Sequence, residues 1–123
     1  MLTTILRGAR FRPTEAQATT VALAADEQLW LRAEPTNPYD PNAIQVFAAT
    51  DSESDLVENG RIFIGYVAKE DCASVKALGD PESLLCFVDM PNGAQPQLRI
   101  ELPSDDEYFP DDEDDSFEEA DDD

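Results

Sequence analysis

The sequence predicts a mostly β domain, an antiparallel β-barrel with one or two short helices. Three observations support this fold class. Short segments rich in β-branched and apolar residues recur through residues 1–103, turn-forming residues separate them, and a single segment has the apolar spacing of a helix. With 123 residues the chain has the length of one domain, and we expect one hydrophobic core.

Several segments have the composition or the alternation of β-strands. In one of them, Leu29 and Leu31 alternate with Trp30 and Arg32, which is typical of a strand in a half-buried sheet. The other segments mix β-branched, aromatic and aliphatic residues between polar breaks. The expected strands, in chain order, are residues 3–8, 19–24, 28–33, 43–49, 61–67, 84–90 and 97–102.

The connections between these strands contain the residues that favour turns. Asn59 and Gly60 form a dipeptide typical of a tight hairpin turn, and Pro91 begins a similar turn with an asparagine and a glycine. Residues 50–55 are all polar, and we expect them to form a flexible loop. The remaining connections are the polar break at residues 13–15 and a proline-rich corner at residues 34–43.

One helix is expected at residues 72–78. Apolar side chains recur there every three residues from Cys72 to Leu78, and Asp71 stands where a capping residue would begin the helix. Gly79 follows the last apolar position and is a typical helix end. The segment is short, so the domain remains mostly β.

Charge is distributed unevenly along the chain. Residues 1–103 contain 15 acidic and 8 basic residues, a net charge of −7, whereas residues 104–123 contain 13 acidic residues and no basic ones. An acidic segment of this kind cannot bury enough apolar surface to offset the entropy lost on ordering. We therefore expect a folded domain at residues 1–103 and a disordered acidic tail at residues 104–123.

The sequence also indicates where the protein is located in the cell and which state its two cysteines adopt. No apolar run approaches the about 18 residues of a membrane span, and no secretory signal is evident, so we expect a cytoplasmic protein without membrane contact. Cys72 and Cys86 lie among apolar residues and lack Cys-x-x-Cys spacing. We expect both to be small core residues, and a disulfide or a reactive thiol is the alternative.

The residues that most enzyme mechanisms require are missing. The chain contains no histidine, no serine in a Gly-x-Ser-x-Gly elbow and no glycine-rich phosphate loop. The carboxylates of residues 111–115 do not follow the spacing of a calcium loop. We therefore expect a protein that is not an enzyme and that needs neither a metal nor another cofactor.

The proline-rich corner is the strongest functional signal in the sequence. Residues 34–43 read Glu-Pro-Thr-Asn-Pro-Tyr-Asp-Pro-Asn-Ala. Each proline fixes its own φ near about −65° and biases the preceding residue toward an extended conformation. We therefore expect a rigid corner with Tyr39 and Asp40 at its tip. A corner that is ordered in advance binds a ligand at low entropic cost.

Residues 37–46, Asn-Pro-Tyr-Asp-Pro-Asn-Ala-Ile-Gln-Val, are followed by Ile-Gly-Tyr-Val at residues 64–67. This pair of motifs resembles the signature of the HIRAN domain, a β-barrel module of DNA-remodelling translocases that also occurs alone in bacteria and their viruses. Residues 6–11, Leu-Arg-Gly-Ala-Arg-Phe, resemble the first strand of that family, and the resemblance covers residues 3–102. It implies an OB-like barrel.

The resemblance also implies a ligand, the 3′ end of single-stranded DNA, which HIRAN domains of eukaryotic translocases hold. An aspartate after the Pro-Tyr pair accepts a hydrogen bond from the 3′-hydroxyl there, so Asp40 would have that role. Tyr39 and Phe11 would stack on bases, while Arg10 and Lys69 would contact phosphates. The candidate DNA-binding residues are Arg10, Phe11, Tyr39, Asp40, Tyr66 and Lys69.

Each candidate also has a purely structural interpretation. Tyr39 would only cover the turn, Asp40 would cap backbone amides, and Phe11 would belong to the core. Tyr66 would be a packed aromatic whose preceding glycine allows a bulge or a close backbone approach. Lys69 would be an ordinary exposed charge. Arg12 occupies a position where DNA-binding members tend to have an aromatic residue.

Two functions from different classes remain open. The first is a module that binds a single-stranded DNA 3′ end, with the acidic tail competing for the site. The second is an acidic interaction protein or DNA mimic that inhibits a basic nucleic-acid-binding partner, such as a host nuclease. The corner motif favours the first and the net charge of −20 favours the second. Tyr108, Phe109 and Phe117 are interleaved among the carboxylates of the tail.

Overall fold

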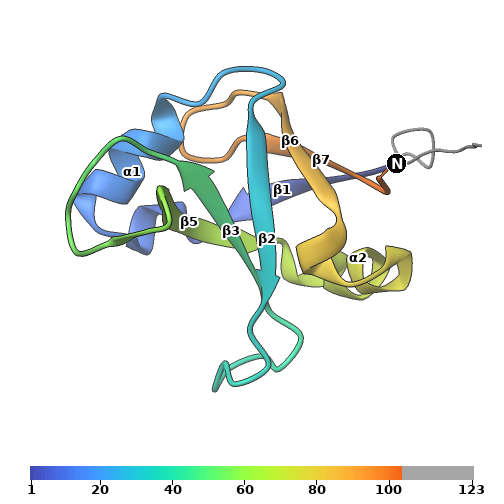
Figure 1. The fold of residues 1–123 in the computed structure, drawn as a ribbon. Helices are drawn as coiled ribbons and strands as arrows, with labels where there is room; N and C mark the ends of the chain where they lie inside the picture. The colour runs from blue at the N-terminus through green and yellow to red at the C-terminus, as the bar shows by residue number, and fades with distance from the viewer. Residues whose placement is uncertain (104–123) are drawn as a thin grey trace, which may run out of the picture.

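The computed structural model describes residues 1–103, which form a closed antiparallel barrel with short helices (Figure 1). The strands are β1 (Leu2–Arg7), β2 (Gln28–Ala33), β3 (Ile44–Ala49), β4 (Val57–Glu58), β5 (Arg61–Val67), β6 (Leu85–Met90) and β7 (Gln97–Glu101). The helices are α1 (Thr14–Val21) and α2 (Cys72–Leu78), with 3-10 turns η1 (Ala9–Phe11), η2 (Lys69–Asp71) and η3 (Pro81–Ser83). The expected disordered tail at residues 104–123 lies outside the described residues.

The strands follow the order β1-β7-β6-β2-β3-β5-β4, and an additional pairing of β1 with β5 closes the sheet on itself. Strand β1 achieves this closure because its first part pairs with β7, while Leu6 and Arg7 pair with β5. Six strands therefore form the barrel, and β4 extends it beside β5. The predicted mostly β, OB-like barrel with one or two short helices is confirmed, and the structure has two α-helices.

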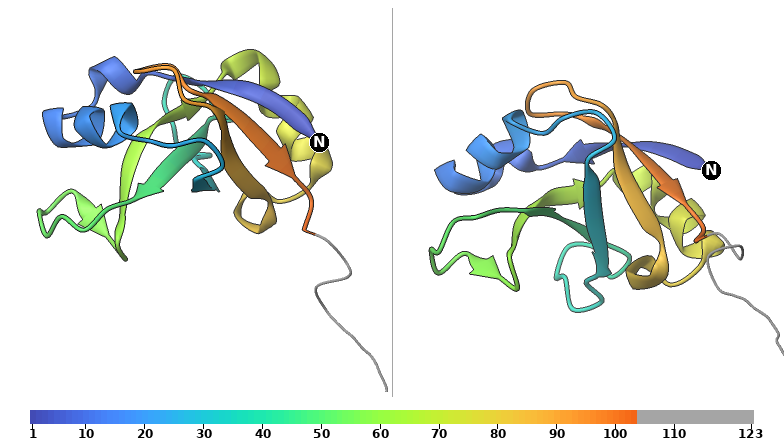
Figure 2. Two further views of the ribbon diagram at one scale, coloured as in Figure 1. Left: turned by 90° about the horizontal axis from the view of Figure 1, so that it is seen from above. Right: turned by 45° about the horizontal axis from the view of Figure 1, so that its top comes forward.

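The two α-helices lie at opposite ends of the barrel, and residues 34–43 project from the ends of β2 and β3 (Figures 1 and 2). Inward-facing aliphatic side chains from all six barrel strands fill the interior. Cys72 and Cys86 are both buried and both unbonded, so the prediction that they are core residues is confirmed. No helix in the described part of the chain is long and apolar enough to cross a membrane.

The strand expected at residues 19–24 is wrong, because this segment forms the end of α1 and the turn after it. The β-branched side chains of Thr19 and Thr20 favoured a strand, but their hydroxyls donate to the carbonyls of Glu15 and Ala16 one turn earlier, at 3.0 and 2.9 Å. Ala16 and Thr20, four residues apart, are both buried. Helical spacing thus outweighs strand propensity here.

The turn expected at Asn59 and Gly60 is confirmed, with φ angles of 56° and 76°. Both values suit the tight hairpin turn that joins β4 to β5. Strand β4 itself was not predicted, because two residues are too few to show the alternation of a strand. It pairs Val57 with Ile62 and Glu58 with Arg61.

Gly65 has both a close backbone approach and a bulge, the two alternatives that the sequence left open. A Cβ atom at this position would lie 2.6 Å from the carbonyl oxygen of Arg7, so only glycine lets β1 approach β5 this closely. The ladder between β3 and β5 also shifts register beside it, with Val46 opposite Gly65 and Phe47 opposite Phe63. The bulge turns Tyr66 to the outer face of the barrel.

Helix α2 forms at the expected residues, but Asp71 does not cap it. Its carboxylate instead accepts a 2.6 Å hydrogen bond from the hydroxyl of Thr4 on β1. This contact ties the 3-10 turn η2 to the barrel. Asp71 therefore bonds to a residue 67 positions away in sequence instead of to the N–H groups at the start of α2.

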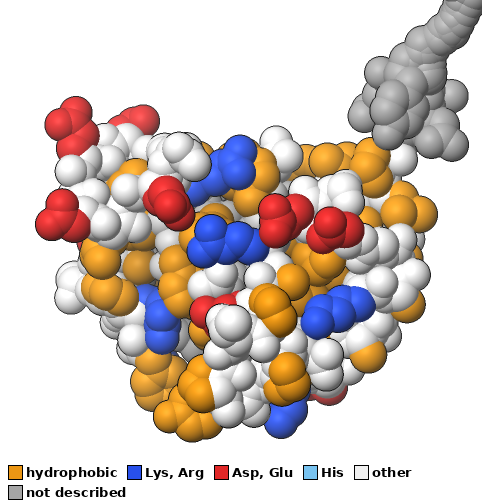
Figure 3. Space-filling view, turned by 60° about the horizontal axis from the view of Figure 1, so that its bottom comes forward, with side chains coloured by type: hydrophobic (Ala, Val, Ile, Leu, Met, Phe, Trp, Pro, Cys, Tyr) orange, Lys and Arg blue, Asp and Glu red, His pale blue; other side chains and the backbone are white. Residues whose placement is uncertain are grey.

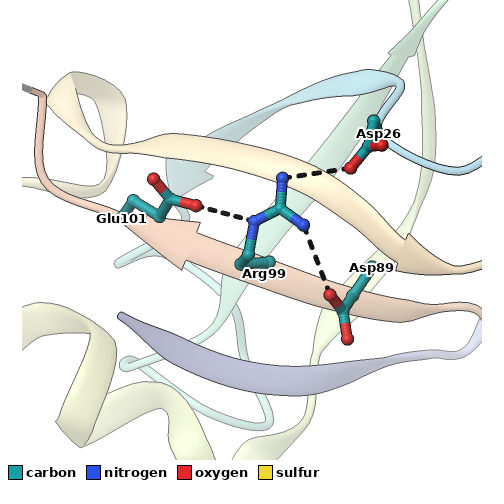
Figure 4. Close-up of polar contacts among 4 residues, drawn as sticks. All are labelled: Asp26, Asp89, Arg99 and Glu101. Carbon is teal, nitrogen blue, oxygen red and sulfur yellow. Dashed lines mark hydrogen bonds and ion pairs between the residues drawn. The ribbon is translucent and has the colours of Figure 1, made fainter.

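Arg99 lies outside the barrel on β7, surrounded by carboxylates of three segments (Figure 4). Its guanidinium contacts Glu101 at 2.6 Å, Asp26 at 3.2 Å and Asp89 at 3.3 Å. The hydrogen bond to Glu101 is the largest of the causes that raise the pKa of Arg99. These carboxylates neutralise the cation, so Arg99 contributes little attraction for an anionic ligand.

Candidate nucleic-acid interface

The proline-rich corner is held by its own polar side chains. The Oδ1 atom of Asn37 accepts hydrogen bonds from the backbone N–H groups of Tyr39, at 2.8 Å, and Asp40, at 3.0 Å. The N–H of Glu34 donates to the carbonyl of Ala43 at 2.9 Å, which closes the base of the corner. Together with the prolines, these bonds hold the tip in one conformation.

The tip presents one aromatic ring and one carboxylate. The Tyr39 side chain is 91% exposed, so it does not serve as a cover for the turn. Asp40 is half-buried, and its Oδ1 accepts a 2.9 Å hydrogen bond from the N–H of Asn42, which confirms the capping interpretation for that oxygen. Within residues 1–103, its Oδ2 accepts no hydrogen bond and can accept one from a ligand.

A carboxylate beneath the corner connects it to the barrel wall. Oε1 of Glu34 accepts hydrogen bonds from the Tyr66 hydroxyl and from Asn37 Nδ2, both at 2.8 Å. Oε2 accepts one from Gln45 at 3.2 Å. Burial, followed by the hydrogen bond to Glu34, raises the pKa of Tyr66, so its phenol stays protonated as a donor. Tyr66 therefore positions the corner through Glu34.

A groove of about 650 Å³ lies between this corner, the end of β5 and the turn η2. We call it the corner groove. Four of the six candidate residues line it, and five further polar or charged side chains complete most of its wall. The candidates are Tyr39, Asp40, Tyr66 and Lys69, and the additional residues are Arg7, Arg12, Glu34, Asn37 and Glu70.

Arg10 and Phe11 lie outside the corner groove. They line a neighbouring hollow of about 680 Å³, formed with the loop at residues 92–95, and Arg7 belongs to both. Phe11 is 70% exposed, so the core interpretation of this residue is wrong. The guanidinium of Arg10 lies 4.9 Å from the centre of the Phe11 ring. The structure therefore divides the candidate set between two adjoining hollows.

The cations around the corner groove differ in their pairing. Arg7 contacts Glu70 at 3.5 Å across an exposed pair, which water screens. No carboxylate in the described residues lies within ion-pair distance of Arg12 or the exposed Lys69. Figure 3, with the lower side of Figure 1 turned forward, shows separate basic side chains among hydrophobic and acidic ones rather than one continuous basic patch.

The groove brings together three kinds of side chain that can contact a ligand. It combines an exposed ring, a carboxylate oxygen that can accept a hydroxyl proton, and cations that can meet phosphates. Residues 1–103 contain no group of three or more acidic or cysteine side chains arranged to hold a metal ion. The groove therefore supplies recognition by stacking, hydrogen bonding and charge.

The sequence did not identify Arg7, Glu34 or Asn37 as parts of this site. Asn37 carried a signal, because an asparagine two residues before an N–H that needs an acceptor is typical of an Asx turn. Glu34 carried none, since its partner Tyr66 is 32 positions away. Arg7 enters the groove only because β1 pairs with β5.

Comparison with known proteins relates the fold and the sequence to one family. The family model described as the HIRAN domain matches residues 3–103. The crystal structure of the HIRAN domain of human HLTF is similar, with a TM-score of 0.54 and 20% identity over 80% of this chain and 71% of that one.

A crystal structure of a protein from Lactobacillus plantarum is also similar, with a TM-score of 0.61 and 23% identity over 82% of this chain and 93% of that one. No curated protein matches the chain in sequence. At these identities the two structures support the fold, while the family match covers nearly the whole described domain. The chain belongs to the HIRAN domain family, which is known for DNA binding.

Proposed function

We propose that this chain is a non-catalytic module that binds the 3′ end of single-stranded DNA in the corner groove. The observation that supports this function most directly is the half-buried Asp40 carboxylate, with an oxygen left for a ligand, next to the exposed ring of Tyr39. A terminal 3′-hydroxyl would donate to Asp40. The last base would stack on Tyr39, and Lys69 and Arg12 would face phosphates.

Size and preorganisation support the same proposal. The groove volume of about 650 Å³ lies within the about 300–1,000 Å³ of small-ligand pockets, enough for a terminal nucleotide. The corner is already ordered by Asn37 and by the Glu34–Tyr66 hydrogen bond. Binding would then require little further ordering of the protein.

The test compares free and blocked 3′ ends on the same labelled oligonucleotide at low salt. Asp40→Ala should weaken binding of the free end by about 1–3 kcal/mol, the cost of leaving a buried polar group unpaired. A 3′-phosphate should weaken binding to the unaltered protein, because its charge would face the carboxylate. Equal affinity for free and phosphorylated ends would exclude Asp40 from this role.

The acidic tail is proposed to compete with DNA for the groove. Residues 104–123 contain 13 carboxylates with Tyr108, Phe109 and Phe117 between them, an arrangement chemically similar to bases among phosphates. Tethering gives such a segment an effective concentration that can reach the millimolar range. Changing the three aromatic residues to serine keeps the charge. Stronger DNA binding by that variant would support competition, whereas unchanged binding would indicate electrostatic repulsion alone.

A second function, inhibition of a basic nucleic-acid-binding protein by mimicry of DNA, is supported by charge. Residues 1–103 alone have a net charge of −7, and three carboxylates already surround Arg99. Binding to a basic nuclease at low salt, together with absence of binding to single-stranded DNA, would favour mimicry. Binding to single-stranded DNA, together with absence of binding to the nuclease, would favour the 3′-end module.

A further inference from the structure

Three aromatic side chains form a continuous row across the outer face of strands β2, β3 and β5. Trp30 lies opposite Phe47 in the β2–β3 ladder, and Phe47 lies opposite Phe63 in the β3–β5 ladder. The centres of the Phe47 and Phe63 rings are 5.7 Å apart. All three side chains are half-buried, so each keeps part of its ring at the surface. We call these residues the aromatic row.

Each ring of the aromatic row has one guanidinium stacked on it. Arg61 lies 3.9 Å from the ring centre of Trp30, Arg32 lies 4.7 Å from that of Phe47, and Arg12 lies 4.7 Å from that of Phe63. These arginines are three of the 8 basic residues in the chain. Of the three, only Arg32 contacts a carboxylate within residues 1–103, that of Glu58 at 3.7 Å across an exposed pair.

The aromatic row is continuous with the corner groove. Tyr66 lines the groove and meets the ring of Phe63 edge-on, with ring centres 5.1 Å apart and an interplanar angle of 84°. Arg12 also lines the groove while it stacks on Phe63. At the other end, Trp30 and Arg61 line a hollow of about 250 Å³. An extended ligand that leaves the groove past Tyr66 would therefore meet alternating rings and cations.

We propose that the aromatic row binds the nucleotides that precede the 3′ end, so that single-stranded DNA runs from the corner groove across the outer face of β5, β3 and β2. This inference rests on the proposed function of the groove. Stacking of a base on an aromatic ring is typically stronger than an exposed cation–π contact, so a base displaces the guanidinium from the part of the ring that remains at the surface. The released arginine then contacts the adjacent phosphate. Rings and cations of the protein thus match the alternating bases and phosphates of the DNA strand.

The experiment compares two labelled oligothymidylates with free 3′ ends, one of about 4 and one of about 12 nucleotides, within the range of site sizes of OB folds. The short one fills only the groove, whereas the long one also reaches the row, and it should bind more tightly. Trp30 is the chain's single tryptophan, so its emission reports the row directly. Saturation with the long oligonucleotide should quench this emission, and the short one should leave it unchanged.

Two variants test the roles of ring and cation. Trp30→Leu should weaken binding of the long oligonucleotide about tenfold and leave the short one unaffected, while Trp30→Phe should keep most of the affinity. Arg61→Gln should lower the slope of log affinity against log salt by about 0.7 for the long oligonucleotide, as expected for one lost phosphate contact. Lys76→Gln removes the same charge from a residue that lines neither the groove nor the row, and it should preserve that slope.

The outcomes separate this proposal from the function on which it rests. If both lengths bind alike and Trp30 emission does not change, the row binds no DNA, while sensitivity to a 3′-phosphate still supports the groove. If neither length binds at low salt, both proposals fail. Quenching of Trp30 by polyaspartate as strong as that by the oligonucleotide would assign the row to acidic protein segments and overturn its role in DNA binding.

Discussion

The hydroxyl of Tyr66 donates a 2.8 Å hydrogen bond to Oε1 of Glu34, and this bond joins strand β5 to the start of the proline-rich corner. The same carboxylate oxygen accepts from Asn37, whose own side-chain oxygen holds the N–H groups of Tyr39 and Asp40. A residue of the barrel wall thus controls the position of the exposed tip through three successive hydrogen bonds, from Tyr66 to Glu34, from Asn37 to Glu34 and from the tip N–H groups to Asn37.

Tyr66→Phe should therefore reduce both stability and DNA binding. Removing the phenolic donor leaves Glu34 with Asn37 and Gln45, and the free energy of unfolding should fall by about 0.5–1.5 kcal/mol. Urea denaturation measures this loss. Tyr39→Phe is the matched control, because its 91% exposed side chain has no hydrogen-bonded hydroxyl within residues 1–103, and its stability should equal that of the unaltered protein.

Alkaline pH should weaken the same connection. Because the pKa of Tyr66 is raised in the folded protein, the folded state holds this proton more tightly than the unfolded state does. The resulting stabilisation is complete below the ordinary tyrosine pKa of about 10 and is lost as the pH rises through the higher folded value. Unfolding free energies measured across this interval should fall more steeply for the unaltered protein than for Tyr66→Phe. Parallel curves would contradict the assignment.

Gly65→Ala should be strongly destabilising. The new Cβ atom would lie 2.6 Å from the carbonyl oxygen of Arg7 at a φ of 155°, and backbone atoms cannot give way cheaply. Thermal unfolding should show a loss of about 1–3 kcal/mol for the clash, beyond the cost of the positive φ. Gly60→Ala is the control, since φ is 76° there but no atom lies within 4 Å. Equal losses in the two variants would mean that the close approach of β1 to β5 does not matter.

Truncation after Pro103 should leave the melting temperature nearly unchanged. The whole buried apolar cluster of the described structure and all its turns lie in residues 1–103, and the family match ends at residue 103. The truncated and full-length chains are compared by calorimetry at the same ionic strength. A large drop on truncation would show that the tail packs on the barrel and that the domain boundary is misplaced.

Several local features were predictable because neighbouring residues decide them. The tight turn at Asn59 and Gly60 needs two positive φ angles, which these residue types accept readily. The corner at residues 34–43 follows from its prolines and from the Asx bonds of Asn37. The strand expected at residues 19–24 failed, because a local preference of threonine for strands was outweighed by helical bonds to Glu15 and Ala16.

The sequence alone therefore determined the barrel class, the rigid corner, the buried cysteines and the identity of Tyr39 and Asp40 as tip residues. The tertiary structure decided which distant residues meet. Pairing of β1 with β5 brought Arg7 to the groove, and the ladders of β2, β3 and β5 aligned the aromatic row. Strand register and barrel closure depend on the packing of the whole core, so contacts between residues far apart in sequence cannot be inferred from local patterns.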